Sequence, residues 1–315
     1  MNVAVLGVGG VGPAVARLCA VAGHDVALHA GDVTDVMDAV DAVEADIDDA
    51  AAAGELSVRD RDAAVARIEA TTGLEGAVGD ADVVVEATDR KDREALFADV
   101  EAVVDGETLL TTAATDVSVT AVATGLRRPG RALGLHVVDP PDAPLVEVVL
   151  AEQTTADTRE RAVAFVDGLG RESVVVRDTP GFAVSRLTLA LSVEAMTMLD
   201  ERVAGVSAID RALEVGADHR TGPLRAADEA GLDARLAELD HLSETLGDRF
   251  EPPPVLREKV RRGELGRKTG EGFYRWERGE PVEPSDPNPV PDPRTEAAGD
   301  PDASESGGLG GMGPR

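Results

Sequence analysis

The chain of 315 residues has very few aromatic side chains and a single cysteine. With aromatics at 2%, any core must be built from Val, Leu and Ala, and a hydrophobic content of 43% is enough for a globular protein. The lone Cys19 excludes an intramolecular disulfide, and its apolar neighbours favour a buried side chain over a reactive thiol. At this length the apolar residues can form two domains, each with its own core.

The sequence also lacks a long hydrophobic run that is free of charge. The most apolar later stretch, residues 182–199, contains Arg186 and Glu194, so we interpret it as a buried helix rather than a membrane span. The first residues lead directly into an apolar strand pattern instead of a secretory leader. We therefore expect a cytoplasmic protein with no membrane partner, and no metal site is predicted.

Positive charge is scarce. The chain has 60 acidic residues against 31 basic ones, which gives a formal net charge of −29. Such a surface repels nucleic acid and anionic lipid, so neither is an expected partner. At low ionic strength the acidic side chains also repel one another, because the screening length is then long. We therefore hypothesise that the protein works in concentrated salt.

Three glycines near the N-terminus form the most informative pattern. An apolar run, residues 3–6, is followed by Gly7, Gly9 and Gly12 in the spacing G-x-G-x-x-G, and then by a helical pattern. Gly7 permits a tight turn, Gly9 lets the backbone approach a pyrophosphate, and Gly12 lets the helix pack close to the strand. The strand–turn–helix context predicts a dinucleotide site, with a plain strand-to-helix turn as the structural alternative.

The choice of cofactor depends on the end of the second predicted strand, residues 26–28. The carboxylate that usually binds the ribose hydroxyls is missing at Ala30, but Asp32 follows two residues later. No Lys or Arg occurs between Arg17 and Arg59, so a 2′-phosphate would be repelled and NAD is favoured over NADP. The residues that we assign to the cofactor are Gly7, Gly9, Gly10, Val11, Gly12, Asp32, Glu86 and Ala87.

Alternating strand and helix patterns predict an α/β fold, with a doubly wound and mostly parallel sheet in residues 1–180. Strands are expected at residues 3–6, 26–28, 82–87, 108–112, 132–138, 145–150 and 173–176, and residues 58–70 are expected to be helical. Residues 181–277 show helical patterns only and predict an all-α domain. Residues 278–315 are rich in Pro, Gly, Asp, Glu and Ser and predict a disordered acidic tail.

Two ionisable residues lie in neighbouring predicted strands. If the turn spans residues 139–144, its midpoint coincides with the midpoint between His136 and Glu147, so a hairpin places these two side chains opposite each other. A carboxylate within an apolar strand is costly unless it is paired, and pairing with an imidazole fixes the ring's tautomer. A histidine oriented in this way is a good general base. A purely structural pair that joins two strands is an equally good reading of the spacing alone.

At this point the sequence resembles the L-3-hydroxyacyl-CoA dehydrogenases, from residue 2 to about residue 276. The resemblance is carried by Gly134-Leu-His136-Val-Val-Asp139-Pro140, Leu145-Val-Glu147-Val-Val149, Asp178-Thr-Pro-Gly-Phe182-Ala-Val-Ser185-Arg186, Thr221-Gly-Pro223 and Leu265-Gly-Arg-Lys-Thr-Gly-Glu-Gly-Phe-Tyr274. It implies a Rossmann domain, a helical domain that forms a homodimer, and reversible NAD-dependent oxidation of a 3-hydroxyacyl-CoA to the 3-ketoacyl-CoA.

The same resemblance assigns roles to single residues. His136 matches the family's catalytic base and Glu147 its orienting partner. Thr115 stands where the family has a catalytic serine, Ser185 where it has an asparagine before arginine, and Asp139 where it has another asparagine. We expect these three to contact the substrate, with Thr115 and Ser185 also contributing to catalysis. An ionised Asp139 would oppose the negative charge that develops on the substrate oxygen, which predicts a reduced rate or an altered substrate.

The drifted positions leave two alternatives open. One is a dehydrogenase of a CoA-free hydroxy acid on the same fold, as in the gulonate and carnitine dehydrogenase relatives. The other is a non-catalytic NAD- or acyl-CoA-binding protein, which would not need both His136 and Glu147. The candidate cations for the CoA phosphates are Arg90, Lys91, Arg93, Arg267 and Lys268.

Overall fold

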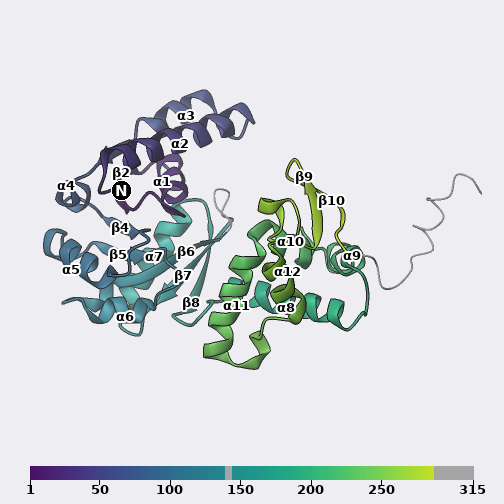
Figure 1. Cartoon of the computed structure of the whole chain (residues 1–315). Helices are drawn as coiled ribbons and strands as arrows, with labels where there is room; N and C mark the ends of the chain where they lie inside the picture. The colour runs from purple at the N-terminus through teal and green to yellow at the C-terminus, as the bar shows by residue number, and fades with distance from the viewer. Residues whose placement is uncertain (139–143, 287–315) are drawn as a thin grey trace, which may run out of the picture. The chain divides into compact units, whose positions relative to one another are not determined.

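The computed structural model describes residues 1–138 and 144–286, and the chain divides into two compact units (Figure 1). The first comprises Met1–Arg186 and the second Leu187–Arg315. The division falls a few residues after the boundary expected at residues 180 and 181. Asp139, one of the predicted substrate contacts, lies outside the described residues.

The first unit alternates strands and helices along the chain. Its elements are β1 (Asn2–Leu6), α1 (Gly12–Val21), β2 (Asp25–His29), α2 (Val33–Ala52), α3 (Val58–Val65), β3 (Ile68–Thr71), α4 (Leu74–Val78), β4 (Val83–Glu86), α5 (Arg93–Val103), β5 (Leu109–Thr112), α6 (Val119–Thr124), η1 (Pro129–Arg131), β6 (Ala132–Val138), β7 (Leu145–Leu150), α7 (Ala156–Gly168) and β8 (Glu172–Arg177). All seven predicted strands are present.

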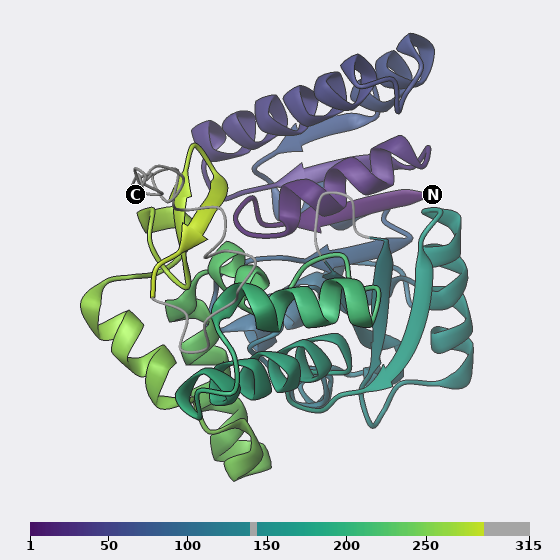
Figure 2. The same cartoon turned by 90° about the vertical axis from the view of Figure 1, so that its right-hand side faces the viewer.

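The eight strands form one sheet in the order β3-β2-β1-β4-β5-β6-β7-β8. Strands β1 to β6 are parallel to one another, whereas β7 and β8 run the opposite way. Two separate apolar cores cover its faces, one contributed mainly by α1, α2 and α7 and the other by α4, α5 and α6 (Figures 1 and 2). Helices on both faces of a mainly parallel sheet confirm the predicted doubly wound fold.

One strand of this sheet was not predicted. The helix expected over residues 58–70 ends at Val65, and Ile68–Thr71 forms β3, which pairs with β2. Because β3 is the edge strand, its side chains are only partly buried or exposed. Its four residues therefore lack the continuous apolar run that marks the central strands of a parallel sheet.

The second unit is mainly helical, as predicted. Its elements are α8 (Val184–Asp200), whose first residues belong to the first unit, α9 (Val206–Gly216), α10 (Pro223–Ala230), α11 (Leu232–Leu246), η2 (Asp248–Phe250), α12 (Pro254–Arg262), η3 (Arg267–Thr269), β9 (Tyr274–Glu277) and β10 (Glu280–Pro284). Its core is formed by apolar side chains of these helices together with Phe250 and Phe273.

The helical unit also carries a β-hairpin, which corrects the prediction that the tail begins at residue 278. Strands β9 and β10 pair antiparallel, and Figure 2 shows them as the yellow-green hairpin. The two residues between them, Arg278 and Gly279, have φ of 53° and 83°. Such positive values at both positions belong to the two-residue turns that favour hairpins. The hairpin begins in the family-like string and ends just before Asp286, the last described residue.

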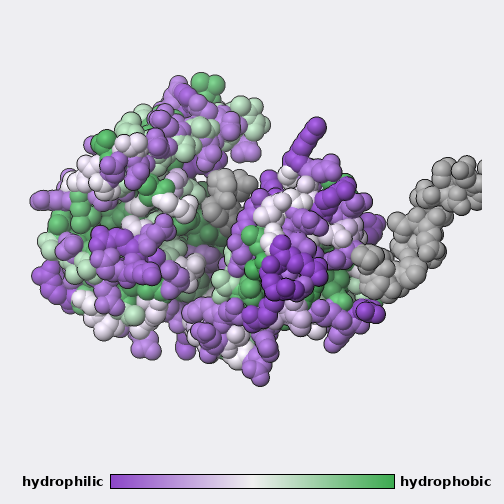
Figure 3. Space-filling model, in the orientation of Figure 1, coloured by the Kyte–Doolittle hydropathy of each residue, from purple (hydrophilic) through white to green (hydrophobic). Residues whose placement is uncertain are grey.

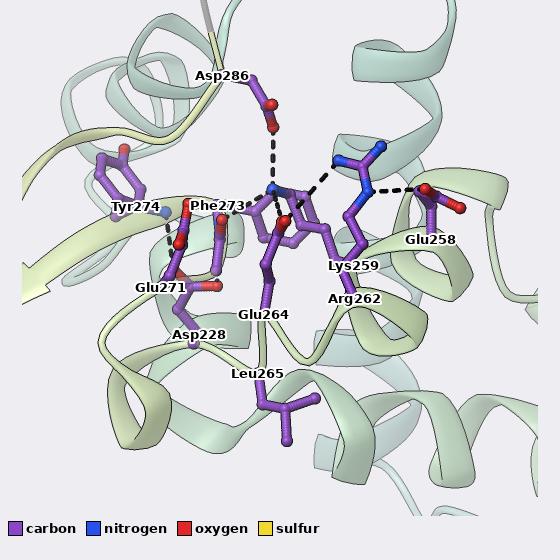
Figure 4. Close-up of polar contacts among 12 residues, drawn as sticks. Asp228, Glu258, Lys259, Arg262, Glu264, Leu265, Glu271, Phe273, Tyr274 and Asp286 are labelled. Atoms are coloured by element: carbon purple, nitrogen blue, oxygen red, sulfur yellow. Dashed lines mark hydrogen bonds and ion pairs between the residues drawn. The ribbon is translucent and has the colours of Figure 1, made fainter.

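A buried lysine holds the end of this hairpin to α12. The side chain of Lys259 is 3% exposed, and its Nζ donates to the Gly272 carbonyl at 2.8 Å (Figure 4). Nζ also lies 3.1 Å from Glu264 Oε2 and 2.9 Å from Asp286 Oδ2, and it stands 5.4 Å from the centre of the Phe273 ring. These three oxygens satisfy the donors of an ammonium group that would otherwise be costly to bury.

The glycine-rich string at the C-terminal end of the family resemblance has a structural explanation as well. Buried Asp228 accepts hydrogen bonds from the backbone N–H groups of Phe273 and Tyr274 and from Trp276 Nε1, each at 2.9 Å. An added Cβ at Gly272 would lie 2.2 Å from Asp228 Oδ1, so only glycine fits there. The glycines of this string therefore fold the chain tightly around a carboxylate.

Hydrophilic side chains are spread over the face shown in the space-filling view, with apolar patches between them (Figure 3). Within residues 1–138 and 144–286, no helix combines the length and the apolar character needed to cross a bilayer.

Candidate functional site

The glycine turn lies where the strand order of the sheet reverses. β1 has β2 on one side and β4 on the other, and dinucleotides bind at such a position beyond the carboxyl ends of the strands. A Cβ on Gly7 would lie 2.3 Å from the Ala87 carbonyl oxygen, and one on Gly12 would lie 2.2 Å from the Gly7 carbonyl oxygen. Both positions therefore require glycine, which brings the first turn of α1 close to the ends of β1 and β4.

A cavity of about 470 Å³ opens at this edge of the sheet. It is lined by residues that follow β1, β4 and β5 and by the end of β6: Gly10, Val11, Ala87, Thr88, Asp89, Arg93, Ala113, Ala114, Thr115, Asp116, His136 and Val137. The cavity thus joins the predicted phosphate-binding turn to the predicted catalytic histidine within one unit.

The residues present fit a dinucleotide. An added Cβ at Gly10 would meet nothing within 4 Å, so the turn is open to a ligand, and the N-terminus of a helix attracts phosphate. Gly10, Val11 and Ala87 line the cavity as predicted cofactor residues should. Asp32 lies after β2 and caps α2 by accepting from the Thr34 N–H at 2.7 Å, a bond that holds its pKa below the ordinary value. An ionised Asp32 agrees with the preference for NAD over NADP.

Glu86, a predicted cofactor residue, instead has its carboxylate bound by protein groups. Its side chain is 1% exposed at the end of β4. Oε1 accepts from the Thr88 N–H at 2.8 Å and from the Thr88 hydroxyl, while Oε2 accepts from Thr112 Oγ1 at 2.7 Å. Glu86 is absent from the residues that line the cavity, and its carboxylate instead binds Thr88, which does line it, and Thr112.

The predicted register of the β6–β7 hairpin is confirmed. His136 pairs directly with Glu147 in the antiparallel ladder, and His136 Nδ1 lies 2.6 Å from Glu147 Oε2. Glu147 is fully buried, whereas the imidazole is 16% exposed and lines the cavity. Phe182 packs against the ring, with 5.6 Å between the ring centres. The imidazole is therefore held from two sides and presented to the cavity.

The second oxygen of Glu147 is held by backbone groups at the start of α8. Oε1 accepts from the N–H groups of Ala183 at 2.8 Å and Val184 at 3.0 Å. Burial alone would raise the pKa of Glu147, but the bonds from His136 and these two N–H groups outweigh it and hold the pKa below the ordinary value. Glu147 is therefore an anion at neutral pH and acts only as an acceptor.

This arrangement determines the tautomer of the histidine. Because an ionised Glu147 only accepts, the proton between the two groups belongs to Nδ1 of His136, and Nε2 of the neutral ring carries a free lone pair. A lone pair exposed at the edge of a cavity can take a proton from a hydroxyl group.

The two other predicted catalytic residues, Thr115 and Ser185, differ from each other in their position relative to the cavity. Thr115 is exposed and lines the same cavity as His136. Ser185 lies on the first turn of α8, next to the residues that bind Glu147, and is not among the residues that line the cavity. Of the two residues predicted to contribute a catalytic hydroxyl, Thr115 lines the cavity and Ser185 does not.

Most of the candidate CoA cations already have carboxylate partners. Arg90 pairs with Asp92 at 2.7 Å, and Lys268 pairs with Asp233 at 2.5 Å. Arg93 is largely buried and pairs with Glu86 and Asp116. Ion pairs on the surface are weak and exchange with solvent, so they do not prevent a cation from binding phosphate.

Three charged residues that line the cavity were not predicted to belong to this site. Asp89 and Asp116 were not assigned, and Arg93 was considered only for CoA, yet all three line the cavity. They follow β4 and β5 by a few residues, and the segments just beyond the carboxyl ends of parallel strands regularly contribute ligands. That topological signal could have identified them.

Comparison with known proteins supports the same assignment across both units. The family model "3-hydroxyacyl-CoA dehydrogenase, NAD binding domain" matches residues 2–179, and "3-hydroxyacyl-CoA dehydrogenase, C-terminal domain" matches residues 181–276. The probable 3-hydroxybutyryl-CoA dehydrogenase of Deinococcus radiodurans is 33% identical over 280 residues, covering 88% of this chain and all of that protein. The 3-hydroxyadipyl-CoA dehydrogenase of Escherichia coli is 34% identical and covers 87% of this chain and 59% of its own length.

Solved structures agree with these matches. The (S)-3-hydroxybutyryl-CoA dehydrogenase of Ralstonia eutropha has a TM-score of 0.82 at 30% identity, covering 88% of this chain and 99% of that one. The 3-hydroxybutyryl-CoA dehydrogenase of Escherichia coli has a TM-score of 0.84 at 34% identity, covering 90% of this chain and 61% of that one. With both domain models matched in order over nearly all of the described residues, the chain belongs to the 3-hydroxyacyl-CoA dehydrogenase family, whose members are NAD-dependent oxidoreductases.

Proposed function

We propose that the protein catalyses the reversible NAD-dependent oxidation of a short-chain L-3-hydroxyacyl-CoA, with His136 as the general base and Glu147 as its orienting partner. The observation that carries this proposal is the His136–Glu147 contact of 2.6 Å in a cavity that also reaches the glycine turn. A histidine that served only to join two strands would not need an exposed edge in that cavity. The short acyl chain is supported by two of the relatives, those of Deinococcus radiodurans and Bradyrhizobium diazoefficiens, which are named 3-hydroxybutyryl-CoA dehydrogenases.

The proton is handled by this chain's own residues. In the oxidation, Nε2 of His136 takes the proton of the substrate hydroxyl. NAD, held at the glycine turn, would supply the acceptor for the hydride. The imidazolium that forms is stabilised by the anionic Glu147, which keeps its hydrogen bonds to Ala183 and Val184 throughout. In the reverse direction the same imidazolium returns the proton to the ketone oxygen, which acquires negative charge as it is reduced.

Thr115 provides a second polar contact for the substrate oxygen. Thr115 lines the cavity together with His136, and its hydroxyl is the group that would donate a hydrogen bond to a substrate oxygen bound there. Removing one such donor typically costs on the order of a hundredfold in rate. We assign Thr115 to this role. Ser185 lies on the first turn of α8, next to the backbone groups that bind Glu147, and stays a candidate substrate contact.

The test is a coupled measurement of binding and turnover in molar KCl. Purified protein is mixed with NADH and acetoacetyl-CoA, and NADH consumption is followed for wild type, His136→Ala and the control His241→Ala, whose side chain is exposed on α11. We expect His136→Ala to lose turnover by about a hundredfold or more while its affinity for NADH is unchanged. The control should match wild type.

The alternatives give different results in the same experiment. Turnover of free hydroxy acids with NAD, and none of the CoA thioester, would identify a CoA-free dehydrogenase. NADH binding without turnover of either class of substrate would identify a binding protein. Equal turnover by His136→Ala and wild type would exclude His136 as the base.

The helical unit has exposed apolar residues that suit a homodimer. Leu187 and Leu191, one turn apart on α8, are 68% and 37% exposed, and Val215 on α9 is 70% exposed. Apolar side chains exposed in this number favour burial against a partner. We propose that the protein is a homodimer, which light scattering after size exclusion would test; a monomer that keeps full activity would contradict it.

A further inference from the structure

The hydroxyl of Thr115 belongs to a segment without helix or strand structure. Residues 113–118 connect β5 to α6, and Thr115 and Asp116 are both exposed. A donor that must meet a substrate oxygen has to be held in place, since a displacement of about 1 Å can cost a hundredfold in rate. Contacts on both sides of Thr115 hold this segment at the edge of the cavity.

On its N-terminal side the segment is held through Glu86. Thr112 Oγ1 donates to Glu86 Oε2 at 2.7 Å and accepts from the Ala114 N–H at 3.1 Å. The Ala113 N–H donates to the Glu86 carbonyl at 2.7 Å. The residues just before Thr115 are therefore attached to the end of β4.

On its C-terminal side the segment is held through Arg93. Arg93 Nη2 lies 3.2 Å from Asp116 Oδ1 and donates to the Thr88 carbonyl at 3.0 Å. Arg93 Nε lies 3.4 Å from Glu86 Oε2, so this path ends at the same carboxylate as the first. The Arg93 side chain is 10% exposed and the Glu86 side chain 1%, whereas Asp116 is 72% exposed and would otherwise be free to move with solvent.

We propose that Glu86, Arg93 and Asp116 form a clamp that positions Thr115 for the reaction, with Asp116 as a positioning residue. Thr115 is enclosed between two attachments, Ala114 on one side and Asp116 on the other, and both lead to Glu86. This inference rests on the proposed function, because it concerns the substrate contact made by Thr115. It also gives the buried Glu86 a supporting role in place of direct cofactor contact.

The geometry explains why a guanidinium is needed. The Arg93 guanidinium lies within reach of the Glu86 carboxylate, the Thr88 carbonyl and the Asp116 carboxylate at the same time. The guanidinium reaches them from two separate nitrogens, Nε toward Glu86 and Nη2 toward Thr88 and Asp116, and the single nitrogen of a lysine at this position lacks that planar fork. Arg93→Lys is therefore expected to behave like the loss of Asp116 rather than as a conservative change.

Asp116→Asn is the main variant, because Asp116 is exposed and the change keeps its shape while it removes the charge. Asp92→Asn is the matched control: Asp92 directly precedes Arg93 but pairs with Arg90, is 62% exposed and does not line the cavity. The first readout is hydrogen–deuterium exchange of residues 113–118 in the protein without ligand. The second is the kcat and the KM for NADH and acetoacetyl-CoA.

We expect Asp116→Asn to raise exchange in residues 113–118 several-fold and to lower kcat about tenfold, with KM for NADH within twofold of wild type. Asp116→Glu, which retains the charge, should recover part of the rate, and Asp92→Asn should match wild type in both readouts. Because Arg93 and Asp116 act through one contact, adding Arg93→Lys to Asp116→Asn should cost less than the sum of the single changes.

Two results would overturn the clamp. In one, Asp116→Asn exchanges like Asp92→Asn; in the other, residues 113–118 exchange faster but kcat is unchanged. A wild-type protein that turns over no hydroxyacyl-CoA would contradict the proposed function instead. The exchange experiment, which needs no substrate, would still decide whether the three residues hold the segment.

Discussion

The carboxylate of Glu147 does two things at once because its oxygens have different partners. Oε2 meets the His136 imidazole, and Oε1 receives the N–H groups of Ala183 and Val184. A fully buried carboxylate is costly unless it is hydrogen-bonded in this way. The bonds that orient the base are therefore also bonds that stabilise the fold.

Glu147→Gln should show both effects. The neutral amide no longer favours the Nδ1–H tautomer of His136, so we expect turnover to fall on the order of a hundredfold. The folded-state pKa of Glu147 lies below its ordinary value of 4.5, so its stabilisation is fully present above that value and is lost as pH falls through the folded-state pKa. Urea unfolding of both proteins should differ most near neutral pH, and the difference should shrink in acid. A constant difference across the pH range would contradict this account.

Cys19 gives a second prediction for a single residue. It is fully buried on α1, and this burial raises the pKa of its thiol to about 12. Since the thiolate is the reactive form, the folded protein should resist alkylation by iodoacetamide at pH 8 and react only after unfolding in urea. Mass spectrometry of the intact protein measures this directly, and rapid labelling of the native protein would show that α1 opens.

Among the elements, α12 shows how the helical unit retains a buried charge. Lys259 is surrounded by Glu264, Asp286 and the Gly272 carbonyl, as Figure 4 shows. Both carboxylates keep some contact with solvent, at 19% and 53% exposure. Removing the ammonium therefore leaves no fully buried unpaired anion, whereas removing the carboxylates leaves a buried cation with a single carbonyl.

This asymmetry predicts the order of stability of two variants. Lys259→Met should lose only about 1 kcal/mol, because the carboxylates that it leaves behind, Glu264 and Asp286, are partly exposed and can be hydrated. The double variant Glu264→Gln, Asp286→Asn should lose about 3 kcal/mol, because the cation loses its charged partners. The free energies of unfolding come from urea titrations; a less stable Lys259→Met than the double variant would contradict the prediction.

At the scale of the whole molecule, the net charge of −29 dominates the expected behaviour in solution. Screening falls from a Debye length of about 8 Å at physiological ionic strength to about 3 Å at 1 M salt. We expect the melting temperature to rise steadily from low to molar KCl, by about 2–4 °C for each 1 kcal/mol of repulsion relieved. NaCl should have a similar effect, and a melting temperature independent of salt would remove the reason to regard the composition as an adaptation to salt.

Much of the fold and the His136–Glu147 pair could be predicted, because the sequence patterns that indicate them lie within short segments or follow from the symmetry of a hairpin about its turn. The glycine spacing is read within ten residues, and the His136–Glu147 register follows from a hairpin whose midpoint is determined by its own turn. The edge strand β3 was missed because it is short and half-exposed, and β10 because Pro281 and acidic residues resemble a tail. The contacts of Lys259 with Gly272 and Asp286 join residues that are well separated in the sequence, so no motif or spacing predicts them.

One consequence follows from the way Glu147 is held. The N–H donors of Ala183 and Val184 lie beyond residue 179, where the match to the NAD-binding domain model ends. A fragment cut at that boundary would keep the dinucleotide-binding turn and strands β6 and β7. Its Glu147 would lack the two backbone N–H donors that bind Oε1. The groups that orient the base therefore extend past the end of the matched domain but stay within the compact unit Met1–Arg186. A fragment that ends at residue 179 should bind cofactor but hold a loosened, poorly oriented imidazole.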